Sequence, residues 1–466
     1  MSPDARKISG LVFFDALLGL WLWMVHLSPA QIISTLIFFT IIGGTLTYWA
    51  RRLSFALIGI AILLGLRLLD LPHLIEFAGL DIILFLVGMM TVIGFLEERR
   101  FFEHVIEELI NRVGVNASRV VAVLLLASFI SAALVDEVTS VLFMLSALLH
   151  LTERHKVNPV PFVMMVVFAT NIGSSATVVG NPIGVMIALR AGLTFEDFLR
   201  WAFPLALLCV LATIPICLWM FRGAIKELNE KMREHHTKRH PETVEVVPVS
   251  PKALRTCWWL FGTTVALLIC HSQLEHWLGL EKNTMLLGTS LIAAGVALWL
   301  NHDNAREIIE KRVDWWTLSF FIVLFASVGT LKLTGVTAEL ANWVMRVAEG
   351  QLGMLLTLIT GASSLLTAFL DNVLAVATFI PVMGELTKAG IYTTPIWWGL
   401  LFGGTLFGNM TIIGSTANIV AIGLLEKKKL GSISFMTWLW PGFLISTVTL
   451  AIAMTGLWLQ IPLMPR

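Results

Sequence analysis

The chain has 466 residues, of which 57% are hydrophobic and 14% are charged, and its formal net charge is +1. A soluble fold could not bury so much apolar surface, so we expect lipid to surround most of the chain. The near-neutral charge gives no support for binding to nucleic acid. All four cysteines lie in apolar stretches, where cysteine usually acts as a small hydrophobic residue, so we predict no disulfide framework.

Apolar stretches long enough to cross a bilayer core of roughly 30 Å occur eleven times, which predicts an all-α polytopic membrane protein. The first stretch follows Arg6 and Lys7 and resembles a signal peptide. No small-x-small cleavage site comes after it, so we interpret it as a retained first helix. The predicted spans are residues 11–27, 31–49, 53–69, 80–96, 159–189, 198–221, 257–278, 285–300, 315–331, 395–425 and 435–459.

Two further apolar segments, residues 120–151 and 352–386, are interrupted near their middle by acids. We interpret both as re-entrant hairpins that enter and leave the membrane on one side. With the N-terminus in the cytoplasm and the C-terminus outside an inner membrane, most of the 32 Lys and Arg residues lie on the cytoplasmic side. Turning one hairpin into two crossings would invert every later loop and remove this bias.

The same motifs occur twice along the chain. Asp136 corresponds to Asp371 at an offset of 235 residues, and residues 177–180 correspond to residues 411–414 at an offset of 234. A Phe-x-x-Trp-x-x-Pro motif also follows in both halves. Each repeat has three full crossings, so the two copies have inverted topology, the construction that alternating-access transporters use.

This repetition predicts five parts of the chain. They are N-terminal scaffold helices (1–78), repeat 1 (79–221, with hairpin 120–151 and broken helix 159–189), a cytoplasmic linker (222–256), further scaffold helices (257–313) and repeat 2 (314–460, with hairpin 352–386 and broken helix 395–425).

Histidines in two places raise the question of a bound metal. The linker cluster of His235, His236 and His240 is more typical of a solvated segment than of a metal site. The His-x-x-x-Glu-His pattern at residues 271–276 differs from the His-Glu-x-x-His of metalloproteases. We therefore predict a transporter rather than an enzyme, without a cofactor.

The broken-helix motifs carry the strongest signal for a binding site. Residues 171–182 read NIGSSATVVGNP and residues 408–418 read GNMTIIGSTAN, both within apolar stretches. Irregular backbone at membrane depth is tolerated only where it is buried in protein or lines a cavity. Packing of small residues is the alternative, but two copies in register favour an ion site. The candidates are Asn171, Gly173, Ser174, Ser175, Thr177, Gly180, Asn181, Gly408, Asn409, Thr411, Gly414, Ser415, Thr416 and Asn418.

The hairpin tips add acids to these oxygen ligands. An ionised acid near the bilayer centre costs about 2.5–3.5 kcal/mol or more, so it is rarely present without a function. Each acid could instead cap the following helix, and the two roles are compatible because a helix N-terminus is also an ion site. Asp136 and Asp371 are stronger candidates than Glu137, whose counterpart is neutral. The tip residues that we expect to bind sodium are Asp136, Glu137, Thr139, Ser140, Asp371 and Asn372.

Several segments resemble the ion transporter superfamily, and most of all its melanosomal P protein and arsenite permease group. They include AALVDEVTSVLFM (132–144), FATNIGSSATVVGNP (168–182), LDNVLAVATFIPVM (370–383) and GNMTIIGSTANIV (408–420). NhaD-type sodium–proton antiporters and dicarboxylate/sodium symporters are relatives of that group. The resemblance covers about residues 80–459 and is specific for the superfamily rather than for a substrate.

This resemblance implies a homodimer in which scaffold helices hold two transport domains that move as elevators. It also implies one cation half-site from residues 136–140 with 171–182, and another from 371–372 with 408–418. The chain departs from P-like proteins, which usually have Asp-Asn at the first tip and a second acid near a Gly-Asp-Pro-Pro turn. Here the tip is Asp136-Glu137 and the turn is Gly-Asn-Pro-Ile, so an acid has moved from the turn to the tip.

Three kinds of transport remain open. A sodium–proton antiporter would use the acids to hold a proton or a sodium ion alternately. A sodium- or proton-coupled carrier of dicarboxylate, arsenite or another oxyanion would bind its anion at half-helix N-termini. Neither predicted broken helix contains a basic residue, and Arg190, just after the first, is the nearest one. This mildly disfavours a highly charged anion as the substrate. An ion channel is the third kind, but inverted repeats favour alternating access. The expected partners are therefore small ions or a small-molecule anion, membrane lipids and a second copy of the chain.

Overall fold

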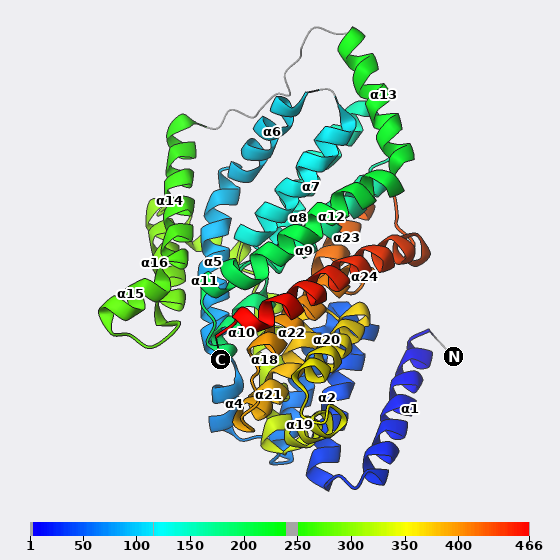
Figure 1. The fold of residues 1–466 in the computed structure, drawn as a ribbon, viewed down its shortest axis with the longest axis vertical. Helices are drawn as coiled ribbons and strands as arrows, with labels where there is room; N and C mark the ends of the chain where they lie inside the picture. The colour runs from blue at the N-terminus through cyan, green and yellow to red at the C-terminus, as the bar shows by residue number, and fades with distance from the viewer. Residues whose placement is uncertain (1–2, 115, 239–249, 466) are drawn as a thin grey trace. The chain divides into compact units, whose positions relative to one another are not determined.

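The computed structural model describes residues 3–114, 116–238 and 250–465, and within these ranges every regular element is a helix (Figure 1). The all-α prediction is therefore confirmed. Seven helices of the described chain are long and apolar enough to cross a membrane, or eight if the bent pair α14 (Pro251–Ile269) and α15 (His271–Leu278) forms one span. The count of eleven spans stays a prediction, as do the re-entrant hairpins.

The chain divides into two compact units, which we describe separately. The first comprises residues 1–83, 314–358 and 377–393, and the second comprises residues 84–313, 359–376 and 394–466. These units cut across the five predicted parts, whose boundaries stay a prediction.

The first unit is built around the helix α3. Its neighbours α2 and α18 pack against it, and Ile60, Leu63, Leu69 and Ala326 form a buried cluster. Its helices are α1 (Pro3–Met24), α2 (Pro29–Thr47), α3 (Arg52–Gly65), α4 (Leu71–Phe77), α18 (Trp315–Leu333) and α19 (Val336–Val347).

The second unit contains both predicted broken helices. Its helix α7 packs along α9, and α12 packs along α24. Its helices are α6 (Phe101–Val113), α7 (Ala117–Leu134), α8 (Glu137–His155), α9 (Val160–Ser174), α10 (Pro182–Ala191), α11 (Phe195–Asp197), α12 (Phe203–Met220), α13 (Arg222–Lys238), α14, α15, α16 (Thr284–Leu300), α17 (Ala305–Lys311), α22 (Thr394–Leu406), α23 (Thr416–Lys427) and α24 (Phe435–Gln460). Three helices have residues in both units, namely α5 (Leu80–Glu98), α20 (Leu352–Phe369) and α21 (Asn372–Lys388).

Four interruptions of helix in the second unit position the candidate site. The helices α7 and α8 are separated at Asp136, and α20 and α21 are separated at Asp371. Residues 175–181 separate α9 from α10, and the segment between α22 and α23 is a 3₁₀ turn followed by residues 410–415. The last two of these segments contain glycines, and a polar residue caps the helix that follows each of the four interruptions.

One predicted span differs from the structure. Residues 257–278 are not one straight helix, because α14 and α15 meet at Cys270 with an angle of 60°. Glu275 on α15 accepts the backbone N–H groups of Asn283 and Met285 at 3.0 and 2.8 Å, which holds α15 against the start of α16. Cys270 is exposed at this bend, whereas the other three cysteines are buried as expected.

The structure describes both ends of the predicted linker. The helix α14 begins at Pro251, inside the residues assigned to the linker, and α13 ends at Lys238. Among the linker histidines, His240 lies outside the described residues, so the cluster stays untested.

Candidate ion-binding site

Four half-helices of the second unit begin at N-termini that side chains cap. The Oδ1 atom of Asp136 accepts two backbone N–H groups of α8, both at 3.0 Å. Asn181 caps α10 through one backbone N–H at 2.8 Å. The side chains of Asp371 and Ser415 accept the backbone N–H of the second residue of α21 and of α23, at 3.1 and 3.2 Å. Each N-terminus carries partial positive charge, so the four together favour oxygen ligands and anions near them.

Glu137, the first residue of α8, connects its own interruption to the other three. Its Oε1 atom accepts the Asn372 amide at 3.0 Å and the Ser415 hydroxyl at 3.3 Å, and its Oε2 atom accepts the Ser174 hydroxyl at 3.0 Å. The Glu137 side chain is only 2% exposed. These hydrogen bonds put Glu137, rather than Asp136 or Asp371, at the centre of the polar cluster.

Asn171 joins the two broken helices. Its amide nitrogen donates to the side-chain oxygens of Asn409 and Asn418 at 2.7 and 2.8 Å, and its oxygen accepts the Ser415 hydroxyl at 3.2 Å. The Asn418 amide in turn donates to two backbone carbonyls of the second interruption, both at 2.8 Å. All four side chains are buried, so this network fixes the position of both helix breaks.

Asp371 lies in a separate part of the cluster. Its Oδ2 atom accepts the Thr416 hydroxyl at 2.5 Å, while its Oδ1 atom caps α21. Three other predicted residues, Thr139 and Ser140 on α8 and Ser175 just after α9, do not contact Glu137 in the described network. Thr139 contributes a backbone N–H to the Asp136 cap, Ser140 shares a hydrogen bond with Ser131, and Ser175 donates to a carbonyl of its own helix.

Two threonines at equivalent positions make the same contact. Thr177 donates its hydroxyl hydrogen to the backbone carbonyl of Ala133, and Thr411 donates to that of Ala368. Both acceptors lie three residues before a hairpin acid. The hydroxyl hydrogens thus tie each broken helix to its hairpin, and only the oxygen lone pairs remain for a cation.

The glycines allow the backbone in both interruptions to approach closely. A Cβ atom on Gly180 would lie 2.4 Å from the Ser174 carbonyl oxygen, and one on Gly414 would lie 2.7 Å from the Gly408 carbonyl oxygen. A Cβ atom on Gly173 would lie 2.2 Å from a carbonyl oxygen of α7. Because backbone atoms cannot move aside cheaply, these positions require glycine.

The charges of the site are all negative. Residues 135–140, 171–181, 371–372 and 408–418 contain three acids and no basic residue. In the described part of the chain, no group of three His, Cys, Asp or Glu side chains could hold a metal ion. A cation would therefore depend on hydroxyl, amide and carbonyl oxygens together with a carboxylate, and sodium binding stays a prediction.

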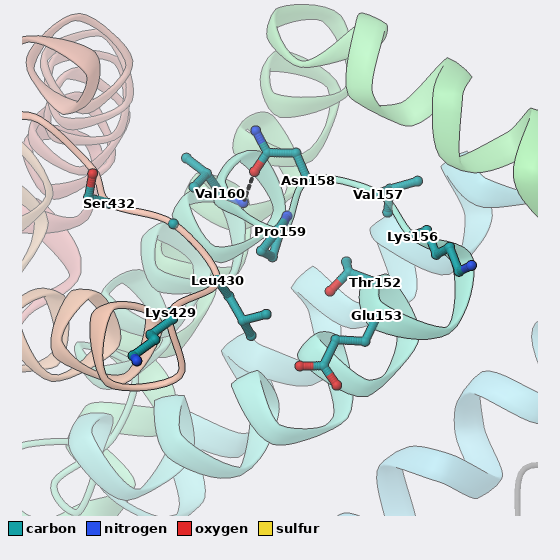
Figure 2. Close-up of a pocket in the computed structure, with 11 residues that line it drawn as sticks. Thr152, Glu153, Lys156, Val157, Asn158, Pro159, Val160, Lys429, Leu430 and Ser432 are labelled. Atoms are coloured by element: carbon teal, nitrogen blue, oxygen red, sulfur yellow. Dashed lines mark hydrogen bonds between the residues drawn. The ribbon is translucent and has the colours of Figure 1, made fainter.

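A surface pocket of about 580 Å³ lies at the opposite ends of two site helices (Figure 2). Thr152 and Glu153, in the last turns of α8, and Lys429, just after α23, line it. Both helices begin at the polar cluster, and at about 1.5 Å per residue the 19 residues of α8 span about 28 Å. The pocket is therefore distinct from the cluster around Glu137.

One contact of the site was not predicted. The Trp438 indole N–H donates to the Asn409 carbonyl at 2.9 Å, and its ring makes an edge contact with Phe168. Trp438 belongs to the repeated Phe-x-x-Trp-x-x-Pro motif. The repetition singled out this residue, but it did not predict the hydrogen bond that its indole donates to the helix break.

Comparison with known proteins agrees with this architecture. A family model described as a citrate transporter, CitMHS, matches residues 36–403 and 340–465. An uncharacterized transporter of Mycobacterium bovis is 31% identical over 383 residues, which are 82% of this chain and 86% of that protein. The human P protein is 27% identical over 492 residues, and the match covers 90% of this chain but 58% of that protein.

A solved structure shows a similar fold. The crystal structure of the Alcanivorax borkumensis YdaH transporter aligns with a TM-score of 0.55 at 16% identity, covering 84% of this chain and 87% of that one. The resemblance to the ion transporter superfamily is thus confirmed. Because the family model matches most of the chain, this protein belongs to the CitMHS citrate transporter family and is a multi-pass membrane transporter.

Proposed function

We propose that this transporter exchanges sodium ions for protons and that Glu137 holds either ion. One observation carries the proposal: Glu137 is 2% exposed, and the side chains that donate to it, from Asn372, Ser174 and Ser415, are all neutral. A bare carboxylate at membrane depth costs about 2.5–3.5 kcal/mol or more. Glu137 would therefore hold a proton or a cation through most of the transport cycle.

The neighbouring groups suit a small hard cation. Hard cations prefer oxygen ligands, and hydroxyl, amide and backbone carbonyl oxygens surround the carboxylate. Two more acids lie near it, because Asp136 adjoins Glu137 in the chain and Asp371 adjoins its hydrogen-bond partner Asn372. When they are ionised, these acids support cation binding and oppose the entry of an unaccompanied anion.

A second candidate is a cation-coupled carrier of a carboxylate. Two observations favour it: the family is described as a citrate transporter, and four half-helix N-termini border the polar cluster. In that case sodium ions or protons would neutralise the acids, and the N-termini would bind the carboxylate. Arg190, in the last turn of α10, is the nearest basic residue of the broken helices.

The test uses the full-length protein in liposomes that contain a pH-sensitive dye. A sodium gradient should drive proton movement in the absence of any organic acid, and Glu137→Gln should reduce the rate at least about tenfold by fixing a neutral site. The matched control is Glu339→Gln, because Glu339 is exposed on α19. Its rate should equal that of the unmodified protein.

Two outcomes would reject the antiport proposal. Proton movement that begins only after citrate or another carboxylate is added would favour the carrier instead. An unchanged rate in Glu137→Gln would show that this carboxyl group does not hold the coupling ion.

We also propose an inner-membrane location, a cytoplasmic N-terminus and a homodimer that moves by an elevator mechanism. The distribution of Lys and Arg residues supports the orientation. Cysteines introduced into α13 should then react with impermeant reagents only from the cytoplasmic side. Labelling from the outside would reject this orientation.

A further inference from the structure

Three buried hydroxyl groups on α20 have no hydrogen-bond partner among the described residues. They belong to Thr360, Ser364 and Thr367, which are 1%, 2% and 0% exposed. A hydroxyl in a helix commonly donates to the carbonyl four residues earlier, as that of Thr405 does, but these three do not. Because a buried polar group without a partner lowers stability, a helix that keeps three of them calls for an explanation.

The three hydroxyls lie on one face of α20, and this face leads to the candidate site. At about 100° per residue, positions 360, 364 and 367 fall within about 60° of one another, and the same face continues to Asp371 just after the helix. At about 1.5 Å per residue, the distance from Thr360 to Asp371 along the helix is about 16 Å. Asp371 accepts the Thr416 hydroxyl, so the row of hydroxyls ends at the second broken helix.

The first hairpin has the same burial at these positions but different side chains. The repeat offset of 235 residues holds between α7 and α20, because Thr177 bonds to the carbonyl of residue 133 and Thr411 to that of residue 368. At this offset, the three hydroxyl positions correspond to the buried residues Leu125, Phe129 and Ala132. Burial at these positions therefore does not require hydroxyl groups.

Close packing of small residues is the alternative explanation for this face. The helix α22 does lie against it, because a Cβ atom on Gly403 would lie 2.5 Å from the Ser363 hydroxyl and 3.0 Å from the Ser364 hydroxyl. The Ser363 hydroxyl donates to the Thr360 carbonyl, whereas the Ser364 hydroxyl has no partner in the described chain. Close packing thus accounts for the small size of these side chains but not for their unpaired hydroxyl groups.

We propose that Thr360, Ser364 and Thr367 line a route by which water and a small cation reach the Asp371 end of the site. When α20 and α22 separate, water or the cation would supply the missing partners, because hydroxyl groups bond to water and their oxygens coordinate hard cations. The route belongs to the second hairpin alone, since α7 has apolar side chains at the equivalent positions. The inference rests on the proposed function only in taking the transported ion to be a cation.

Cysteine labelling of the full-length protein in liposomes tests the route without measuring transport. A membrane-impermeant methanethiosulfonate reagent is supplied on both sides, in a Cys270→Ser background because the other three cysteines are buried. Thr360→Cys and Thr367→Cys should react at least about tenfold faster than Leu125→Cys and Ala132→Cys, because a thiol reacts only where water and reagent reach it. The α7 variants are matched controls, since they lie equally buried at the equivalent positions.

Reagents of opposite charge test whether the route suits a cation. A cationic and an anionic methanethiosulfonate reagent of similar size are compared, with each rate divided by the rate for a free thiol. The cationic reagent should be preferred at least about tenfold at Thr367→Cys, because ionised acids nearby attract cations, and less at Thr360→Cys, which lies farther from Asp371. Equal rates, or a preference for the anionic reagent, would overturn the assignment of the route to a cation.

Thermal unfolding separates the route from a structural role of the hydroxyls. Thr360→Val and Thr367→Val remove hydroxyl groups that lack partners, so the unfolding temperature should stay unchanged or rise. Thr411→Val is the control that should unfold at a lower temperature, because Thr411 donates to the carbonyl of residue 368. An equal decrease in the α20 variants would show that their hydroxyls stabilise the closed packing, and the inference would fail.

The outcomes distinguish the inference from the proposed function. Equal labelling at equivalent positions of α7 and α20 would overturn the route, whether or not a sodium gradient drives proton movement. Fast labelling confined to α20, in a protein that moves no protons with sodium, would support the route and reject the antiport.

Discussion

Replacing Asn171 with alanine tests whether the two broken helices are held together by its amide group. The substitution removes the donor to the Asn409 and Asn418 oxygens, at 2.7 and 2.8 Å, and leaves both oxygens buried without it. A buried polar group that loses its partner costs about 1–3 kcal/mol, so two of them predict a loss of about 2–6 kcal/mol of unfolding free energy. The variant should therefore unfold at a clearly lower temperature.

The buried cysteines provide the assay. A thiol-reactive dye reports unfolding when Cys209 and Cys217 become accessible, in a Cys270→Ser background because Cys270 is already exposed. The control Asn342→Ala removes an exposed asparagine from α19 and should leave the transition unchanged. If Asn171→Ala unfolds at the same temperature as this control, the amide does not join the broken helices and the reasoning is refuted.

Three more predictions concern the helix breaks and the start of α16. Thr177→Val and Thr411→Val should each lower the free energy of unfolding by about 1–2 kcal/mol in the same dye assay, because each removes an equivalent hydroxyl-to-carbonyl hydrogen bond. Unequal losses would mean that the two broken-helix motifs are not equivalent. Gly180→Ala should lower the free energy of unfolding by about 1–3 kcal/mol or more, because the new Cβ atom would lie 2.4 Å from a backbone oxygen. Gly262→Ala should leave it unchanged, because nothing lies near its Cβ position. Equal effects would argue against close packing at the break. Glu275→Ala should accelerate hydrogen exchange at the amides of residues 283 and 285, and unchanged exchange would show that the carboxylate does not hold the start of α16.

The positions of the helix breaks could be predicted from the sequence because local chemistry sets them. Acids within apolar runs mark the breaks at Asp136 and Asp371, and the glycine-rich motifs mark the other two. Repetition of these motifs made the prediction stronger, because a shared structure explains two copies at equivalent positions better than chance does.

The importance of Glu137 could not be predicted in the same way. Its neutral counterpart Asn372 made it the weaker candidate, yet that amide is one of its hydrogen-bond partners at 3.0 Å. A contact between residues 235 positions apart depends on how the repeats pack, which local sequence does not encode. The bend at Cys270 was missed for a related reason: the apolar run continues through it, and the interactions of Glu275 appear only in the folded chain.

The contact between Glu137 and Asn372 explains why one acid and one amide occupy equivalent positions. Positions 137 and 372 contact each other through these side chains, so two acids there would place two carboxylates within hydrogen-bond distance. Like charges that close cannot both ionise, and the pair would share a proton. Asn372→Asp should create this situation: in infrared difference spectra of the full-length protein in liposomes, the carboxyl band that Glu137→Gln removes should titrate in two separated steps instead of one. A single step at an unchanged midpoint would show that position 372 does not face Glu137, and the argument for one titrating group shared by both repeats would fail.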